Sequence, residues 1–102
     1  SPEMKKTQNF YSNLIEQELK SIEDKRTPAT SQIINDALVQ MQTLEKEYDK
    51  LKKDLLKSGK DKRVIFAMIN NFQQRIDLLK QVLEQTQRIN ELKIYKNETN
   101  TL

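Results

Sequence analysis

Only three residues in this chain are strong helix breakers, and their positions constrain its fold more than any other feature. They are Pro2, Pro28 and the single glycine, Gly59. Proline is tolerated in the first turn of a helix but disrupts a helix interior, and glycine often follows a helix end. The remaining sequence is rich in Lys, Glu, Gln and Leu, which favour helices. We therefore expect an all-α chain whose helices are separated near Pro28 and Gly59.

The first helix is predicted from Pro2 to about Asp24. Ser1 and Pro2 are typical of a helix start, and Glu3 suits the positive end of the helix dipole. The apolar residues recur at three-, four- and seven-residue steps, which places them on one face. This apolar face consists of Met4, Tyr11, Ile15, Leu19 and Ile22.

The second helix is predicted to begin at Pro28, because proline pushes Thr27 out of the helical region and is itself favoured at a first helical position. It should end near Lys57, before Gly59. Asp61 can then cap a third helix that ends near Tyr95. We expect one helical domain over residues 1–96 and a disordered tail over residues 97–102, which are rich in Asn and Thr.

The short link through Gly59 predicts that the second and third helices form an antiparallel hairpin. Facing residues should then have numbers that add to about 120. Every facing pair along the apolar faces is apolar or aromatic in this register, as in a coiled coil. Glu45 and Arg75 also face each other and could form an ion pair that opposes slippage. The pairs are Leu55 with Ile65, Leu51 with Ile69, Tyr48 with Phe72, Leu44 with Ile76, Met41 with Leu79, and Ala37 with Leu83.

The first helix should fold back on the second about the Thr27-Pro28 break. The numbers of facing residues in these two helices should add to about 52. This register pairs Ile15 with Ala37 and brings Met4 near Tyr48. In this register the first helix covers only the half of the hairpin that is distant from Gly59. The predicted fold is an antiparallel three-helix bundle: a long, coiled-coil-like hairpin with a protruding tip, plus a shorter N-terminal helix.

The composition excludes most catalytic chemistry. The chain has no His and no Cys, so it has no Ser-His-Asp or Cys-His arrangement and no zinc site of the usual nitrogen and sulfur ligands. The carboxylates that stand in pairs mostly fall outside the apolar faces and are expected at the surface. We therefore predict a protein that is not an enzyme and has no metal or cofactor. These acids are Glu16, Glu18, Glu45, Glu47 and Asp54.

The predicted tip of the hairpin is the candidate partner interface. Its residues are Leu51, Leu55, Leu56, Ile65 and Phe66. Phe66 lies about 100° from the apolar face in helical projection and is the best candidate for an exposed anchor. In the alternative interpretation Phe66 folds over Leu56 and closes the end of the hairpin.

Residues 49–63 carry seven cations and three Asp residues, a local excess of four positive charges. Such a segment could contact nucleic-acid phosphates or anionic lipid headgroups, although a solvated helix surface explains it as well. The absence of interleaved aromatic residues disfavours nucleic acid. In the third helix, Asn71 and Gln74 could similarly be ligand-binding amides, but polar residues that flank an apolar face are ordinary.

Several segments resemble one family of proteins. They are the N-terminal Ser-Pro-Glu-Met, the Leu-Glu-Lys-Glu-Tyr segment at 44–48 and the Ala-Met-Ile-Asn-Asn-Phe-Gln-Gln-Arg-Ile-Asp-Leu-Leu segment at 67–79. With Phe10-Tyr11 and Leu14-Ile15, they resemble single-pass envelope proteins of Bacteroidetes described as anti-sigma factors. The resemblance implies that this chain is the helical domain on the periplasmic side of the cytoplasmic membrane. The tether and the cytoplasmic part would lie outside it.

The sequence and the resemblance together favour a non-catalytic domain for sensing or protein interaction. It would bind a protein partner or a second copy by helix–helix contacts, with the membrane reached only through an upstream tether. Two alternatives remain at this point: a structural spacer or oligomerisation module, and a cationic domain that binds lipid or nucleic-acid surfaces.

Overall fold

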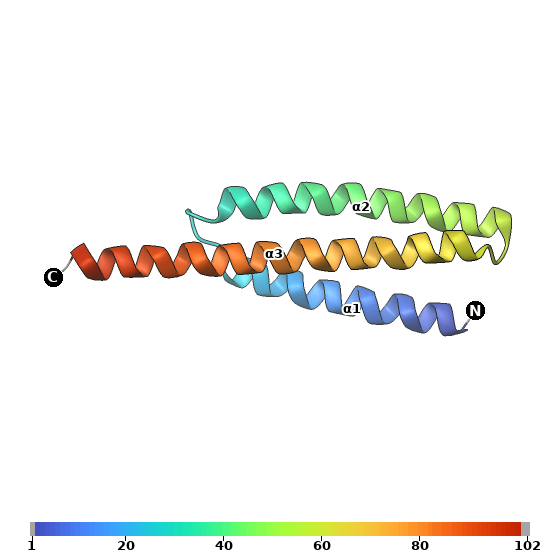
Figure 1. Cartoon of the computed structure of the whole chain (residues 1–102), viewed down its shortest axis with the longest axis horizontal. Coiled ribbons are helices and arrows are strands. Elements are labelled where there is room, and N and C mark those ends of the chain that lie inside the picture. Colours follow the sequence, from blue (N-terminus) through green and yellow to red (C-terminus); the bar gives the residue numbers. More distant parts are fainter. Residues whose placement is uncertain (1, 101–102) are drawn as a thin grey trace.

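The computed structural model describes residues 2–100 and contains three helices, with no strand in that range. They are α1 (Pro2–Asp24), α2 (Ser31–Ser58) and α3 (Lys62–Asn100). α3 runs between the other two helices in the view of Figure 1, and the molecule measures 66 × 21 × 16 Å along its principal axes. The predicted all-α three-helix bundle is confirmed.

The break between α1 and α2 is a turn, and the prediction that α2 begins at Pro28 is wrong. The Thr30 amide donates to the Thr27 carbonyl oxygen at 3.1 Å. In return, the Thr30 hydroxyl accepts a hydrogen bond from the Thr27 amide at 2.8 Å. These two bonds close a four-residue turn in which Pro28 takes the second position, where proline is favoured. α2 therefore begins three residues later, at Ser31.

The break between α2 and α3 lies at Gly59, as the sequence predicts. Gly59 has φ +76° and ψ −134°, a backbone conformation that side chains strongly disfavour. Asp61 precedes α3, and its Oδ1 atom accepts a hydrogen bond from the Arg63 amide at 2.9 Å. This is the predicted cap of the third helix.

The register of the α2–α3 hairpin is confirmed by contacts near its middle. The rings of Tyr48 and Phe72 lie with their centroids 4.7 Å apart. The guanidinium of Arg75 lies 3.5 Å from the Glu45 carboxylate. Both pairs belong to the register in which facing residue numbers add to about 120, so one spacing aligns the apolar and the charged contacts.

α1 packs mainly against α3, and the two helices run in the same direction (Figure 1). Tyr11 stacks on Phe72 with a centroid distance of 5.0 Å. At the start of α1, Met4 lies with Leu55 and Ile65 around a pocket beside the hairpin turn. The prediction that α1 covers only the distant half of the hairpin, and leaves a protruding two-helix tip, is therefore wrong. The Thr27–Thr30 turn moves the fold-back point, and α1 extends at least one helical turn further toward Gly59.

The far end of the molecule also differs from the prediction. α3 continues as a helix to Asn100, although the sequence predicted an end near Tyr95 and a disordered tail from Asn97. No Gly or Pro follows Gly59, so nothing in this segment breaks the helix. The rest of the predicted tail, residues 101 and 102, lies outside the described residues. α3 extends past the ends of α1 and α2 in Figure 1, so the overhang is at the end opposite the hairpin turn.

The core is a narrow seam along the three helices. Ile22, Ile34 and Leu79 are almost completely buried, as are the side chains of Thr30 and Thr86. In α3, Met68 and Val82 are buried more deeply than their predicted neighbours Ile69 and Leu83. The other buried apolar side chains come from all three helices. With Met68 and Val82, they are Ile15, Ala37, Met41, Tyr48, Phe72 and Ile76.

Candidate functional site

The hairpin end holds the five residues predicted as a partner interface, and the structure divides them into two groups. Leu51, Leu55 and Ile65 are half-buried, and the two leucines pack against the core. Leu56 is 85% exposed and Phe66 is 68% exposed. Because Leu56 is so exposed, Phe66 does not close over it as the alternative interpretation required. Only Leu56 and Phe66 can therefore serve as surface anchors.

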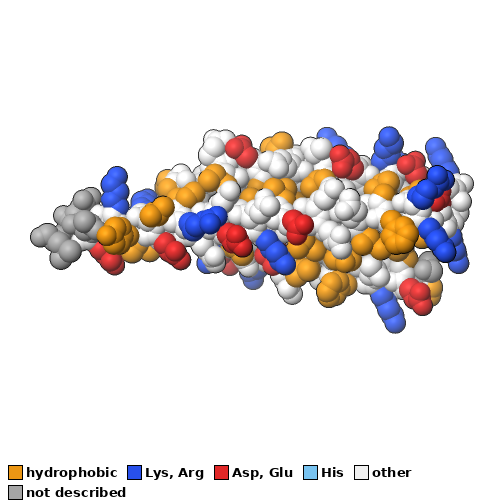
Figure 2. All heavy atoms as spheres, viewed as in Figure 1, with side chains coloured by type: hydrophobic (Ala, Val, Ile, Leu, Met, Phe, Trp, Pro, Cys, Tyr) orange, Lys and Arg blue, Asp and Glu red, His pale blue; other side chains and the backbone are white. Residues whose placement is uncertain are grey.

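The same end of the bundle concentrates positive charge. The seven cations of residues 49–63 are all exposed, and the start of α1 adds exposed Lys5 and Lys6. Figure 2 shows the Lys and Arg side chains gathered at this end, with hydrophobic side chains among them. The predicted register of α1 does not bring Lys5 and Lys6 here, because it lies too far from the hairpin turn. We call this surface the basic end: Lys5, Lys6, Lys50, Lys52, Lys53, Leu56, Lys57, Lys60, Lys62, Arg63 and Phe66.

Acidic side chains at the basic end are fewer, and one of them has a local partner. Hydrogen bonds from the Arg63 side chain and amide lower the pKa of Asp61 below its ordinary value. Asp61 is therefore ionised at neutral pH. Beside it, the pocket between α1 and the hairpin turn has a volume of about 310 Å³ and is lined by Glu3, Met4, Leu55, Gly59, Lys60 and Ile65.

At the opposite end, Asn90 connects α3 to the turn between α1 and α2. Its amide group donates to the Lys25 carbonyl oxygen at 3.0 Å and accepts from the Thr27 hydroxyl, also at 3.0 Å. An amide suits this position because it supplies one donor and one acceptor at once. Asn90 thus marks the point where α3 leaves the bundle.

The segment beyond Asn90 carries three large apolar side chains at the surface. Leu92, Ile94 and Tyr95 are 66%, 59% and 69% exposed. Leu92 and Tyr95 also line a surface pocket together with Arg88 and Glu91. This surface is absent from the sequence prediction, which ends the helix near Tyr95, although the apolar residues at positions 92 and 95 are one turn apart. We call residues 91–98 the α3 arm.

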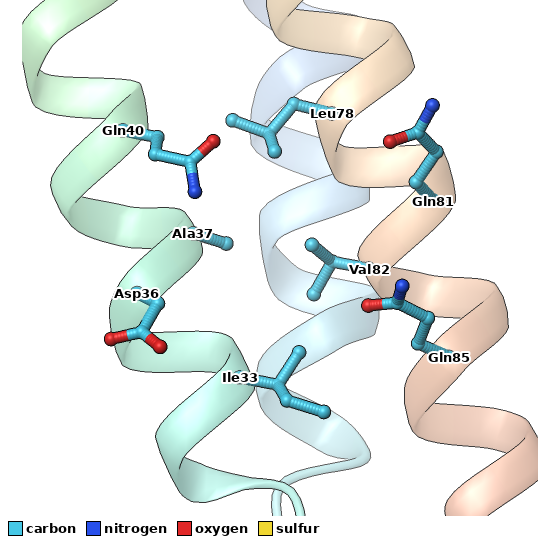
Figure 3. Close-up of a pocket in the computed structure, with 8 residues that line it drawn as sticks. All are labelled: Ile33, Asp36, Ala37, Gln40, Leu78, Gln81, Val82 and Gln85. Carbon is cyan, nitrogen blue, oxygen red and sulfur yellow. The ribbon is translucent and has the colours of Figure 1, made fainter.

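A groove with a volume of about 310 Å³ lies between α2 and α3 on the side of the bundle (Figure 3). Ala37 and Val82 form an apolar floor, and the side-chain amides of Gln40, Gln81 and Gln85 line its rim. Asp36 is the one ionisable residue in its lining, and its carboxylate accepts a hydrogen bond from Gln32 at 2.9 Å. A single exposed carboxylate supplies no acid–base pair, so the groove offers no catalytic arrangement.

The middle of the hairpin contains a small polar cluster around Phe72. Arg75 reaches the Glu45 carboxylate and lies over the rings of Tyr48 and Phe72, with its guanidinium carbon 5.9 and 5.5 Å from their centroids. Asn71 donates to the Leu44 carbonyl oxygen at 2.8 Å. Asn71 therefore has a structural contact across the hairpin, while Gln74 points to the exposed surface.

Three polar atoms of this cluster are buried without a hydrogen-bond partner among the described residues: the Tyr48 hydroxyl, Asn71 Oδ1 and Arg75 Nε. Burial raises the pKa of Tyr48, and the positive charge of Arg75 opposes that shift. The Gln8 side chain of α1 lies near the same hydroxyl. The cluster therefore joins all three helices at a polar point inside an otherwise apolar seam.

The paired acids are distributed over the surface. Glu16, Glu45 and Glu47 are exposed, and Glu18 and Asp54 are half-buried. Within residues 2–100, no three metal-binding side chains of the His, Cys, Asp and Glu types form a group that could hold an ion. No helix in that range has the length and apolar character needed to cross a membrane.

No family model, no curated protein and no solved structure matches this chain.

Proposed function

We propose that this domain is a non-catalytic helical module that binds a protein partner through the α3 arm. The observation that carries the proposal is the exposure of Leu92, Ile94 and Tyr95 on a helix that extends past α1 and α2. The arm continues a 39-residue helix whose earlier part is packed in the bundle, and these three side chains are not covered by the core. Burial of these side chains against a partner would stabilise the arm and supply the binding energy together.

The partner that best suits the arm is another protein, not a second copy of this chain. Three exposed apolar side chains cannot alone bury the roughly 1,200 Å² that a specific stable interface requires. A homodimer through the arms would have the same few apolar side chains on both sides. A different protein with a hydrophobic groove can contribute the missing area and bind the arm as a helix.

For the biological context, we propose a regulator of the membrane-anchored anti-sigma type, with this domain on the periplasmic side. The support is the resemblance of residues 1–4, 44–48 and 67–79 to that family. A signal would pass through such a domain only if the partner has different affinities for two packings of the helices. Docking of the arm would act on the bundle through Asn90, which links α3 to the turn between α1 and α2.

A second candidate function is a structural spacer, which the length of 66 Å favours. The experiment that separates the two begins with a photo-crosslinking amino acid at Leu92 in cells of the native organism, and with the same probe at exposed Val39 as the matched control. The proposal predicts a discrete protein adduct from position 92 only, and binding of that identified, purified protein to the domain. Absence of an adduct, or the same adducts from both positions, would contradict it.

The mass of the isolated domain in solution completes this test. The proposal predicts a monomer by sedimentation equilibrium, because the arm needs a larger partner surface. A tight oligomer that Leu92→Ser dissociates would instead support an oligomerisation module.

A further inference from the structure

We propose that the basic end docks on the surface of an anionic lipid bilayer, with Leu56 and Phe66 entering the headgroup region. This inference concerns the end opposite the α3 arm and does not depend on the proposed function of the arm. It follows from the charge, the exposed apolar side chains and their position in the fold.

Charge is separated along the molecule. The basic end has nine exposed cations, and only four acids accompany them: Glu3, Asp49, Asp54 and Asp61. The local excess is five positive charges, while the whole chain has a net charge of +3, so the remainder carries a net charge of −2. An anionic surface would therefore attract this end and orient the long axis of the bundle toward it.

The two most exposed large apolar side chains of residues 2–90 lie within this charged surface. Leu56 is three residues before Gly59 in α2, and Phe66 is five residues after Asp61 in α3. The numbers 56 and 66 add to 122, so the hairpin register places both residues at the same level along the bundle. Side chains of this kind, surrounded by cations, are typical of proteins that insert shallowly into a membrane interface.

The chemistry of this surface favours lipid over nucleic acid. Eight of the nine cations are lysines, whose flexible apolar stems can lie along a bilayer while their ammonium groups contact phosphates. Nucleic acid would gain little from an aliphatic anchor such as Leu56, because single strands are held by stacked aromatic rings. Phe66 is the only aromatic residue of the basic end. A lipid surface uses the cations and both apolar anchors.

The test is co-sedimentation of the full chain with vesicles of phosphatidylcholine alone, or of phosphatidylcholine with about 30% phosphatidylglycerol, at about 0.1 M salt. We expect binding to the anionic vesicles only, and weaker binding as salt is raised. The Lys57→Glu/Lys60→Glu variant should weaken binding at least about tenfold, because each cation near the surface contributes about fivefold. The Leu56→Ser/Phe66→Ser variant should weaken it about tenfold through the loss of apolar insertion.

Matched changes at the opposite end serve as controls. Lys93→Glu/Lys96→Glu alters the same number of exposed lysines, and Leu92→Ser removes an exposed leucine. Both controls should bind anionic vesicles as the unmodified chain does, and circular dichroism should show that every variant is folded. Binding that is absent, or that falls equally in the controls, would overturn the proposal. Binding to a DNA duplex that is tighter than vesicle binding and unchanged in Leu56→Ser/Phe66→Ser would replace lipid with nucleic acid.

Discussion

Tyr11 of α1 and Phe72 of α3 stack with their ring planes 10° apart and their centroids 5.0 Å apart. Tyr48 of α2 also packs on Phe72, with the two ring centroids 4.7 Å apart. One ring from each helix therefore meets at a single level of the bundle. This cluster sets the position of α1 along α3 and thereby brings the start of α1 to the basic end.

The first prediction concerns Phe72, which is central to this cluster and almost fully buried. Phe72→Ala should lower the free energy of unfolding by about 3–5 kcal/mol, because it removes a large core side chain from contacts with two helices. Phe10→Ala is the matched control, since Phe10 is largely exposed and should change stability by less than about 0.5 kcal/mol. Urea unfolding followed by circular dichroism measures both. Equal effects of the two changes would show that Phe72 is not a core residue.

The second prediction concerns the Glu45–Arg75 ion pair in the hairpin. The Arg75 side chain is nearly buried, but the Glu45 side chain is exposed and the nitrogen–oxygen distance is 3.5 Å. The pair should therefore contribute only about 0.2–1 kcal/mol, as exposed pairs do. A double-mutant cycle with Glu45→Gln and Arg75→Gln measures this coupling in urea unfolding. A coupling energy above about 2 kcal/mol would mean that the contact is more strongly desolvated than the structure indicates.

The third prediction concerns Asn90, which holds the turn between α1 and α2 against α3 by two hydrogen bonds. Asn90→Ala leaves the Lys25 carbonyl oxygen and the Thr27 hydroxyl without these partners and should cost about 1–3 kcal/mol. Exposed Asn9 offers a matched control, and Asn9→Ala should have almost no effect. Hydrogen exchange should also be faster at the Thr30 amide in Asn90→Ala. Unchanged stability and exchange would show that the turn does not depend on Asn90.

The fourth prediction is a pH dependence of stability. Arg63 lowers the pKa of Asp61, and Arg26 lowers the pKa of Glu23 through a hydrogen bond. A carboxyl group with a lowered pKa in the folded state stabilises the fold above its ordinary pKa of about 4, and this contribution is lost as the pH falls. The melting temperature should therefore drop between about pH 6 and pH 3.

The Asp61→Asn variant isolates the contribution of the α3 cap. Asparagine keeps the ability to cap a helix but cannot ionise, so this variant should fold and show a smaller drop in melting temperature over the same pH range. An identical pH profile in Asp61→Asn would mean that Asp61 contributes nothing to the acid sensitivity.

The hairpin could be predicted from sequence because its determinants are local. Gly59 ends α2, Asp61 begins α3, and the regular apolar spacing leaves one register in which Tyr48 meets Phe72. The Glu45–Arg75 contact follows from that same register. These features depend on residue type and spacing, which the sequence displays directly.

The placement of α1 could not be predicted because it depends on tertiary contacts. Pro28 is compatible with a helix start and with a turn, and the buried hydroxyl of Thr30 decides for the turn. The turn moves α1 toward Gly59, so α1 covers the predicted bare tip. Of the five predicted interface residues, only Leu56 and Phe66 stay exposed. The α3 arm was missed for a related reason, since a polar sequence without a breaker is compatible with a helix and with a disordered tail.

The most direct test of the account is the proximity of the α1 start to the hairpin turn, because this contact assembles the basic end and leaves the α3 arm at the other end. The chain has no Cys, so Glu3→Cys/Lys60→Cys introduces a single pair of thiols at two residues that line the same pocket. We expect rapid intramolecular cross-linking of this variant by a short bis-maleimide, and little cross-linking of Glu3→Cys/Lys93→Cys. Cross-linking in Glu3→Cys/Asp49→Cys, without cross-linking in Glu3→Cys/Lys60→Cys, would contradict this placement of α1. It would support the register in which the hairpin tip is bare.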